Sequence, residues 1–265
     1  MPDDDQRRPP LAQRTMTVPR GMVPHHAYYP RDVQRPGPGL ENSRLHGTGR
    51  VADDLYLIAH HETSGKPYLS PRAVGIGLAG AMLAELLIAI RPAVALENGR
   101  MFPLYRRNGE LVARYAGPDE PVAQRALDLI AAESQLRPVR DWLLFLGRTA
   151  PADVAGRLEH SGYLTRSARW LPWLAGRPVP VQGDWSQCAL LRAHAALDLT
   201  RTLTPYSALL NRLTLACGLT FRFSGFSTTA IRGTEEVSQM LPDALQELVA
   251  HVQEAADAAV LSART

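Results

Sequence analysis

Three glycines in the longest apolar stretch of this 265-residue chain have the spacing that binds a dinucleotide. Gly75, Gly77 and Gly80 form the pattern G-x-G-x-x-G, and the carboxylate of Glu97 follows Gly77 by twenty residues. In dinucleotide-binding folds a buried strand leads directly into such glycines, which let the backbone approach a pyrophosphate at a helix N-terminus. Here the preceding residues start a helix. We therefore predict that the glycines allow close helix packing, and dinucleotide binding stays a minor alternative.

The element that carries these glycines is predicted to be one buried helix from Ser70 to Arg91. Ser70 is a good N-cap, and Pro71 suits the first helical position because its missing N–H would be unpaired there anyway. Apolar residues occupy every face of the stretch, and Glu85 is the only charge inside it. A helix with apolar residues all round belongs in a core. We expect the Glu85 carboxylate to accept hydrogen bonds from backbone amides.

The remaining pattern predicts a mainly α protein, with a single helical-bundle domain over residues 51–265. A small hairpin with strands at 93–97 and 101–107 follows the central helix, and a third apolar segment lies at 110–115. A second hairpin is predicted at 163–181. Helical periodicity or helix signals occur at 52–62, 122–133, 138–146, 152–162, 185–203, 205–220 and 234–262.

Residues 1–50 form a Pro/Arg-rich tail with eight arginines against five acids, which accounts for the chain's net charge of +3. We predict that this tail is disordered because it has no sustained apolar periodicity. It is either an electrostatic tether to an anionic partner or a solvated extension. Among 29 basic residues only Lys66 is a lysine, a bias that we associate with a high-GC bacterial genome and that suggests an actinobacterial source.

The tip of the second predicted hairpin combines aromatic, aliphatic and basic residues. Tryptophan is favourable where an apolar region meets water, so the tip suits a membrane interface or a self-association surface. A loop folded onto the protein body is the alternative. The residues concerned are Arg166, Arg169, Trp170, Leu171, Trp173, Leu174 and Arg177.

No motif in the sequence predicts catalysis. It contains no G-x-S-x-G, Walker motif or zinc-ligand spacing, so we predict a non-enzymatic protein without a metal or cofactor. A helix followed by a small hairpin is also the outline of a winged-helix DNA-binding regulator. The central helix carries Leu, Ile and Ala where a groove-reading helix needs Arg, Asn or Gln, so nucleic acid is a less favoured partner.

No window has the uncharged length of a membrane span, and we expect a soluble cytoplasmic chain without a signal peptide.

Four segments together resemble the GPP34 family, whose eukaryotic members are the Golgi phosphoprotein 3 and Vps74 proteins. They are Leu55–Ile58, the turn Gly65–Pro67, Gly77–Leu86 and Gly162–Thr165 with its hairpin. The resemblance covers about residues 52–262. It implies a mostly helical domain with a protruding hairpin. It also implies a peripheral membrane adaptor that binds phosphatidylinositol 4-phosphate and the cytoplasmic tails of glycosyltransferases, with a homo-oligomer through the hairpin as a further possibility.

The resemblance also locates a lipid pocket. The family's pocket tryptophan falls at Ser70, and its three arginines fall at Ala79, Arg148 and Pro151, so one of the four groups is kept. Arg72, at the start of the central helix, completes the set of candidate lipid-binding residues. Because phosphate recognition needs several convergent charge-assisted bonds, we expect an anionic-membrane role without phosphoinositide specificity. The position would be peripheral, on the inner face of the membrane.

Overall fold

Helix α2 (Pro71–Ile88) runs through the centre of the protein. In this computed structural model the described residues are 48–61, 63–88, 94–103, 121–133, 137–166, 176–180, 204–219 and 237–262. The start of α2 follows its sequence signals, because Ser70 Oγ accepts a hydrogen bond from the N–H of Ala73 at 3.3 Å. Every residue from Ala73 to Leu86 is buried, which confirms the predicted core helix.

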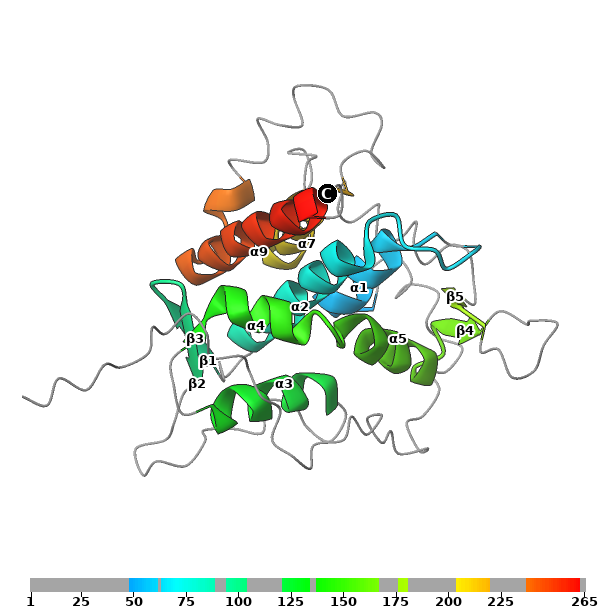
Figure 1. Ribbon diagram of the computed structural model, residues 1–265, viewed down its shortest axis with the longest axis horizontal. Coiled ribbons are helices and arrows are strands. Elements are labelled where there is room, and N and C mark those ends of the chain that lie inside the picture. The colour runs from blue at the N-terminus through cyan, green and yellow to red at the C-terminus, as the bar shows by residue number, and fades with distance from the viewer. Residues whose placement is uncertain are drawn as a thin grey trace, which may run out of the picture.

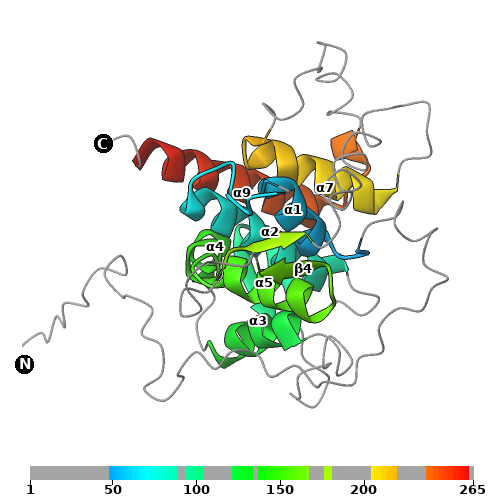
Figure 2. The same cartoon turned by 90° about the vertical axis from the view of Figure 1, so that its right-hand side faces the viewer.

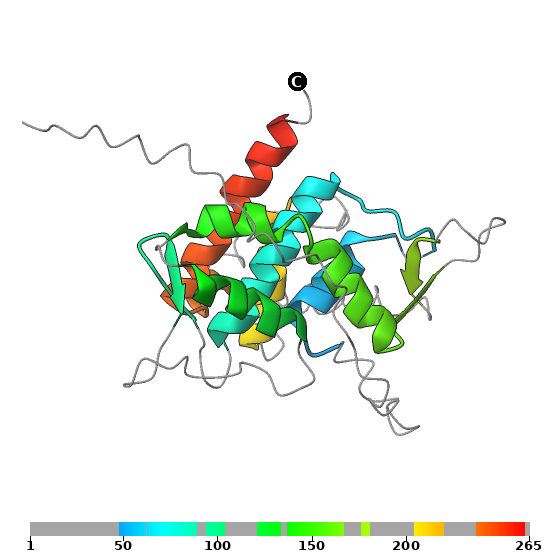
Figure 3. The ribbon, with the colours of Figure 1, turned by 60° about the horizontal axis from the view of Figure 1, so that its bottom comes forward.

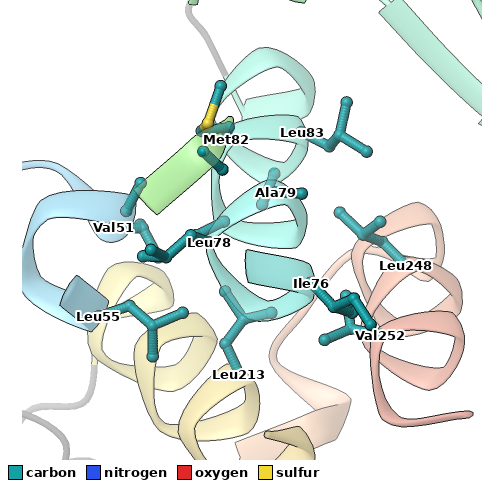
Figure 4. Close-up of a cluster of buried hydrophobic side chains, with 14 of the residues drawn as sticks. Val51, Leu55, Ile76, Leu78, Ala79, Met82, Leu83, Leu213, Leu248 and Val252 are labelled. Carbon is teal, nitrogen blue, oxygen red and sulfur yellow. The ribbon is translucent and has the colours of Figure 1, made fainter. Parts of the chain in front are cut away.

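Other helices surround α2 on several sides (Figure 1). Figure 4 shows apolar side chains of α1, α7 and α9 meeting those of α2, with Leu213 beside Leu78 and Val252 beside Ile76. Together these helices bury one continuous apolar core, and the mainly α fold class is confirmed. The helices around α2 are α1 (Val51–Ala59), α3 (Pro121–Ala132), α4 (Val139–Leu146), α5 (Ala150–His160), α7 (Pro205–Ala216) and α9 (Asp243–Ser262).

By length and composition alone, α2 is apolar enough to cross a membrane. It is the one helix among the described residues that meets this criterion, and 78% of its apolar window is buried inside the protein. Since its apolar surface is already covered by other helices, α2 is accounted for as a core helix.

Two small antiparallel sheets lie at opposite ends of the protein (Figures 1 and 3). The first has the order β1 (Val94–Glu97), β2 (Arg100–Pro103), β3 (Arg137–Pro138). The second pairs β4 (Leu164–Arg166) with β5 (Pro178–Pro180). The first predicted hairpin is therefore confirmed over 94–103, including its turn, and the second is confirmed at its base.

Two details differ from the expectations. The helix predicted at 234–262 is interrupted: residues 237–239 are helical, and α9 begins at Asp243 because Pro242 cannot continue a helix that precedes it. The third strand of the first sheet is Arg137–Pro138, a residue pair that carries no apolar strand pattern. The predicted segments 110–115 and 185–203, the tail 1–47 and the hairpin tip lie outside the described residues.

Candidate functional site

The start of α2 places two of the candidate residues at the surface. Ser70 is half-buried and Arg72 is exposed. The Arg72 guanidinium donates a 3.5 Å hydrogen bond to Ser262 Oγ at the end of α9. A cation is favourable there because the last carbonyls of a helix carry partial negative charge.

The turn between α4 and α5 lies directly against α2. An ideal Cβ on Gly75 would be 2.1 Å from the carbonyl oxygen of Gly147, so only glycine permits this approach. Arg148 follows Gly147, is exposed, and forms no ion pair with a described residue. Pro151, in the first turn of α5, is half-buried and has no N–H to offer a phosphate.

The structure thus brings four of the five candidate lipid-binding residues to one neighbourhood. Gly75 lies one turn after Arg72 on α2, and its contact with Gly147 sets Arg148 beside that helix start. Ala79 differs, because it is fully buried in the core and does not line an exposed surface. The arrangement offers exposed cationic side chains, which suits an anionic partner.

The base of the second hairpin is fastened to the helical body from both strands. Arg166 of β4 pairs with Glu159 of α5 at 3.1 Å. An ideal Cβ on Gly65, in the segment between α1 and α2, would be 2.1 Å from the carbonyl oxygen of Pro178 in β5. Arg177, one residue before β5, is exposed. The tip residues Arg169, Trp170, Leu171, Trp173 and Leu174 lie outside the described residues.

A stacked pair of rings lies at the end of α1, where Glu159 and Arg166 affect its electrostatics. The rings of Tyr56 and His60 lie 3.9 Å apart, and His60 Nδ1 is 2.7 Å from the carbonyl oxygen of Tyr56, to which it donates. Burial lowers the pKa of His60 and, with the nearby Glu159 carboxylate, raises the pKa of Tyr56 to about 12. Both side chains therefore stay neutral near pH 7 and act here as packing groups.

A second cluster of charged residues lies in the core and was not predicted from the sequence. Arg157 of α5 donates from Nε to Asp53 Oδ1 of α1 at 2.8 Å, and its Nη1 is 3.7 Å from Glu85 Oε2 of α2. Glu85 Oε1 accepts the backbone N–H of Ala52 at 2.9 Å, as expected for this carboxylate. The cluster joins three helices.

Desolvation controls the electrostatics of this cluster. Burial, together with the smaller effect of the Glu85 carboxylate, outweighs the attraction of Arg157 and raises the pKa of Asp53 to about 6. The adjacent Asp54 accepts hydrogen bonds from Tyr206 Oη at 2.7 Å and from Thr48 Oγ1 at 2.9 Å. All these carboxylates lie below the surface, so the cluster fastens helices to one another and offers no access to a substrate.

The G-x-G-x-x-G glycines lie within α2 and pack against other parts of the protein, so no space for a phosphate lies beside them. An ideal Cβ on Gly77 would be 2.3 Å from Cys217 Sγ, and one on Gly80 would be 2.3 Å from Val252 Cγ2. No described strand leads into them. The prediction that they pack helices is confirmed. Among the residues that the structure describes, no group of three or more His, Cys, Asp or Glu side chains is arranged to hold a metal ion.

The winged-helix alternative also conflicts with the burial of α2. A recognition helix must present one face to a DNA groove, whereas α2 is buried along its length from Ala73 to Leu86. The alternative is therefore not favoured.

A mainly helical single domain with a hairpin at one end is the architecture that the structure defines. The sequence matches the family described as Golgi phosphoprotein 3 (GPP34) over residues 51–260. The chain belongs to the GPP34 family. A search of curated proteins finds no match. The actinobacterial source stays a prediction.

Proposed function

We propose that this chain is a non-enzymatic peripheral membrane adaptor that binds anionic phospholipid, protein cytoplasmic tails or both. The GPP34 match over residues 51–260, which spans the described helices and both sheets, carries the proposal. The family resemblance supplies the adaptor role and suggests phosphatidylinositol 4-phosphate as one ligand. We place the protein in the cytoplasm and on the inner face of a membrane.

The distribution of charge supports an anionic partner. Exposed basic residues occur on the α1–α2 connection and the start of α2 (63–72), on the turn 147–149 and at the base of the second hairpin (164–166 and 176–180). These described stretches contain no Asp or Glu, and Arg166 is paired with Glu159 of α5. Figure 2 shows the α1–α2 connection, β4 and α5 on the side that faces the viewer. The exposed basic residues are Lys66, Arg72, Arg148, Arg166 and Arg177.

We propose that two further elements strengthen the attraction between these basic residues and an anionic membrane. The tail of residues 1–50 contributes arginines, and Trp170 and Trp173 contribute an interfacial hairpin tip. Each basic residue near an anionic surface is worth about 1 kcal/mol, and joined weak contacts raise one another's effective concentration. With Arg148 as the one arginine at a pocket position, the proposed ligand is anionic lipid in general. The same tip is the proposed contact for a homo-oligomer.

Vesicle co-sedimentation of the full chain tests the proposal. We expect weak binding to phosphatidylcholine and clear binding when phosphatidylserine is added. We also expect a matched charge of phosphatidylinositol 4-phosphate to give a similar gain. Deleting residues 1–50 and changing both tryptophans to serine should each reduce binding.

If the double tryptophan variant binds fully but loses its oligomeric state, the tip is an assembly element and not a membrane contact. If the wild-type chain binds no anionic vesicles, the lipid part of the proposal fails, and an adaptor that binds protein cytoplasmic tails becomes the better hypothesis.

A further inference from the structure

Helix α4 and the turn after it present two arginines that have no carboxylate partner among the described residues. Arg140 and Arg148 are both exposed, whereas the nearby Arg125 is paired with Asp153 at 3.2 Å and Arg137 is paired with Glu133. The sequence between 137 and 148 therefore leaves cationic charge on one side of α4 that no described carboxylate neutralises.

Arg140 and Arg148 flank an aliphatic residue in the sequence, and we call Arg140, Leu144 and Arg148 the α4 stripe. Arg140 and Leu144 lie four residues apart on one side of α4, and Arg148 lies in the turn, two residues after α4 ends at Leu146. Leu144 is half-buried, with part of its side chain packed on the core and part accessible. Asp141 is the exposed acid on α4, one position away from the stripe.

The spacing of the arginines fits an extended anionic surface. A helix rises roughly 12 Å over eight residues, so the two guanidinium groups can contact separate phosphates. A bilayer surface offers many phosphates at once, with apolar chains beneath them, and the accessible edge of Leu144 fits between charged contacts on such a surface. The contact of Gly75 with Gly147 places the Arg148 end of the stripe beside the start of α2.

Resting on the membrane role proposed above, we propose that the outer side of α4 lies against the anionic bilayer, with Arg140 as a second phosphate contact beyond Arg148. Arg140 corresponds to none of the candidate pocket positions. The membrane-contacting surface thus extends along α4 from the turn that carries Arg148.

The test measures partitioning of the full chain onto phosphatidylcholine vesicles that contain phosphatidylserine. Removing one cationic contact with such a surface lowers the partition coefficient about fivefold. We expect Arg140→Gln and Arg148→Gln each to cause this loss and the double variant to lose about 25-fold. Asp141→Asn, which removes the exposed acid on α4, should raise partitioning.

The outcomes separate this inference from the proposed function. If the wild-type chain binds and Arg140→Gln partitions as strongly as the wild type, the α4 surface is not a membrane contact, although the membrane role stands. If the wild-type chain does not bind anionic vesicles at all, the proposed lipid role fails first. Arg140-dependent, salt-sensitive binding to duplex DNA in place of vesicles would identify the stripe as a nucleic-acid surface and overturn the inference. Thermal melting of each variant shows whether the fold is intact.

Discussion

Gly75 and Gly147 meet backbone to backbone, and this contact joins the central helix to the turn that carries Arg148. Because a carbonyl oxygen 2.1 Å from an added Cβ cannot rotate away, Gly75→Ala should force α2 and the α4–α5 turn apart. We expect a loss of about 1–3 kcal/mol in the free energy of unfolding, measured by urea denaturation.

Gly80→Ala is the matched control for that substitution. Its added Cβ would meet the methyl group Cγ2 of Val252 at 2.3 Å, and a side chain yields more easily than a backbone carbonyl. Gly75→Ala should therefore be the more destabilising of the two. The reverse order would show that the Gly75–Gly147 contact is not a fixed feature of the fold.

The same glycines predict that dinucleotides do not bind. A ligand that binds the native state must stabilise it by mass action, so NAD or NADP at roughly millimolar concentration should leave the melting temperature unchanged. A clear rise that disappears in Gly77→Val would contradict the packing role assigned to this motif.

Asp53 should make stability depend on pH. Its folded-state pKa, about 6, lies above the ordinary value of 3.8 for a free aspartate. The folded state therefore holds this proton more tightly, and the stabilising effect, present below pH 3.8, is lost as the pH rises through 6. In Asp53→Asn this side chain cannot titrate. The free energy of unfolding of the variant should therefore rise relative to that of the wild type between pH 5 and pH 7.5. A shift in favour of the wild type would mean that Arg157 lowers the pKa of Asp53 instead.

Gly65 should control the docking of the second hairpin. Its φ of +60° is strained for other residues, and an added Cβ would meet the Pro178 carbonyl oxygen. Gly65→Ala should therefore lose about 1–3 kcal/mol and expose the hairpin to trypsin at Arg166. Gly49→Ala has a comparable φ of +81° with nothing within 4 Å, so it isolates the backbone strain. Equal trypsin cleavage of the two variants would show that the Gly65 contact does not hold the hairpin.

The elements that were predictable from the sequence are those specified by local signals. Ser70 and Pro71 mark the start of α2, and its unbroken apolar content indicates burial. The four apolar residues predicted to face inward from α4 are all buried, namely Val139, Trp142, Leu143 and Leu146. Gly162, predicted to end α5, has the φ of +78° that such a position requires.

The buried ion pairs were not predictable in the same way, because Asp53, Glu85 and Arg157 are brought together from three helices by tertiary packing. A signal was nevertheless present. Glu85 is the sole acid in an apolar helix, and Arg157 lies between Val154 and Leu158 on the buried side of α5. Because an unpaired buried charge is strongly destabilising, a buried acid on one helix and a buried cation on another are expected to form an ion pair.

The candidate lipid site was predictable in its residues but not in its geometry. The family resemblance supplied Ser70, Ala79, Arg148 and Pro151, and the structure shows that Ala79 faces the core while Arg148 is exposed. The neighbourhood of Arg72 and Arg148 depends on a contact between glycines about seventy residues apart, which no local pattern specifies.

The central claim is that this GPP34 protein attaches reversibly to anionic membranes. Its most direct test is the partitioning of the full-length chain between buffer and phosphatidylcholine vesicles with and without phosphatidylserine, over rising salt concentration. Because screening weakens charge contacts between exposed groups, the account predicts binding that requires phosphatidylserine and falls steeply as salt increases. Equal partitioning onto neutral and anionic vesicles, or no partitioning onto either at low salt, would contradict it.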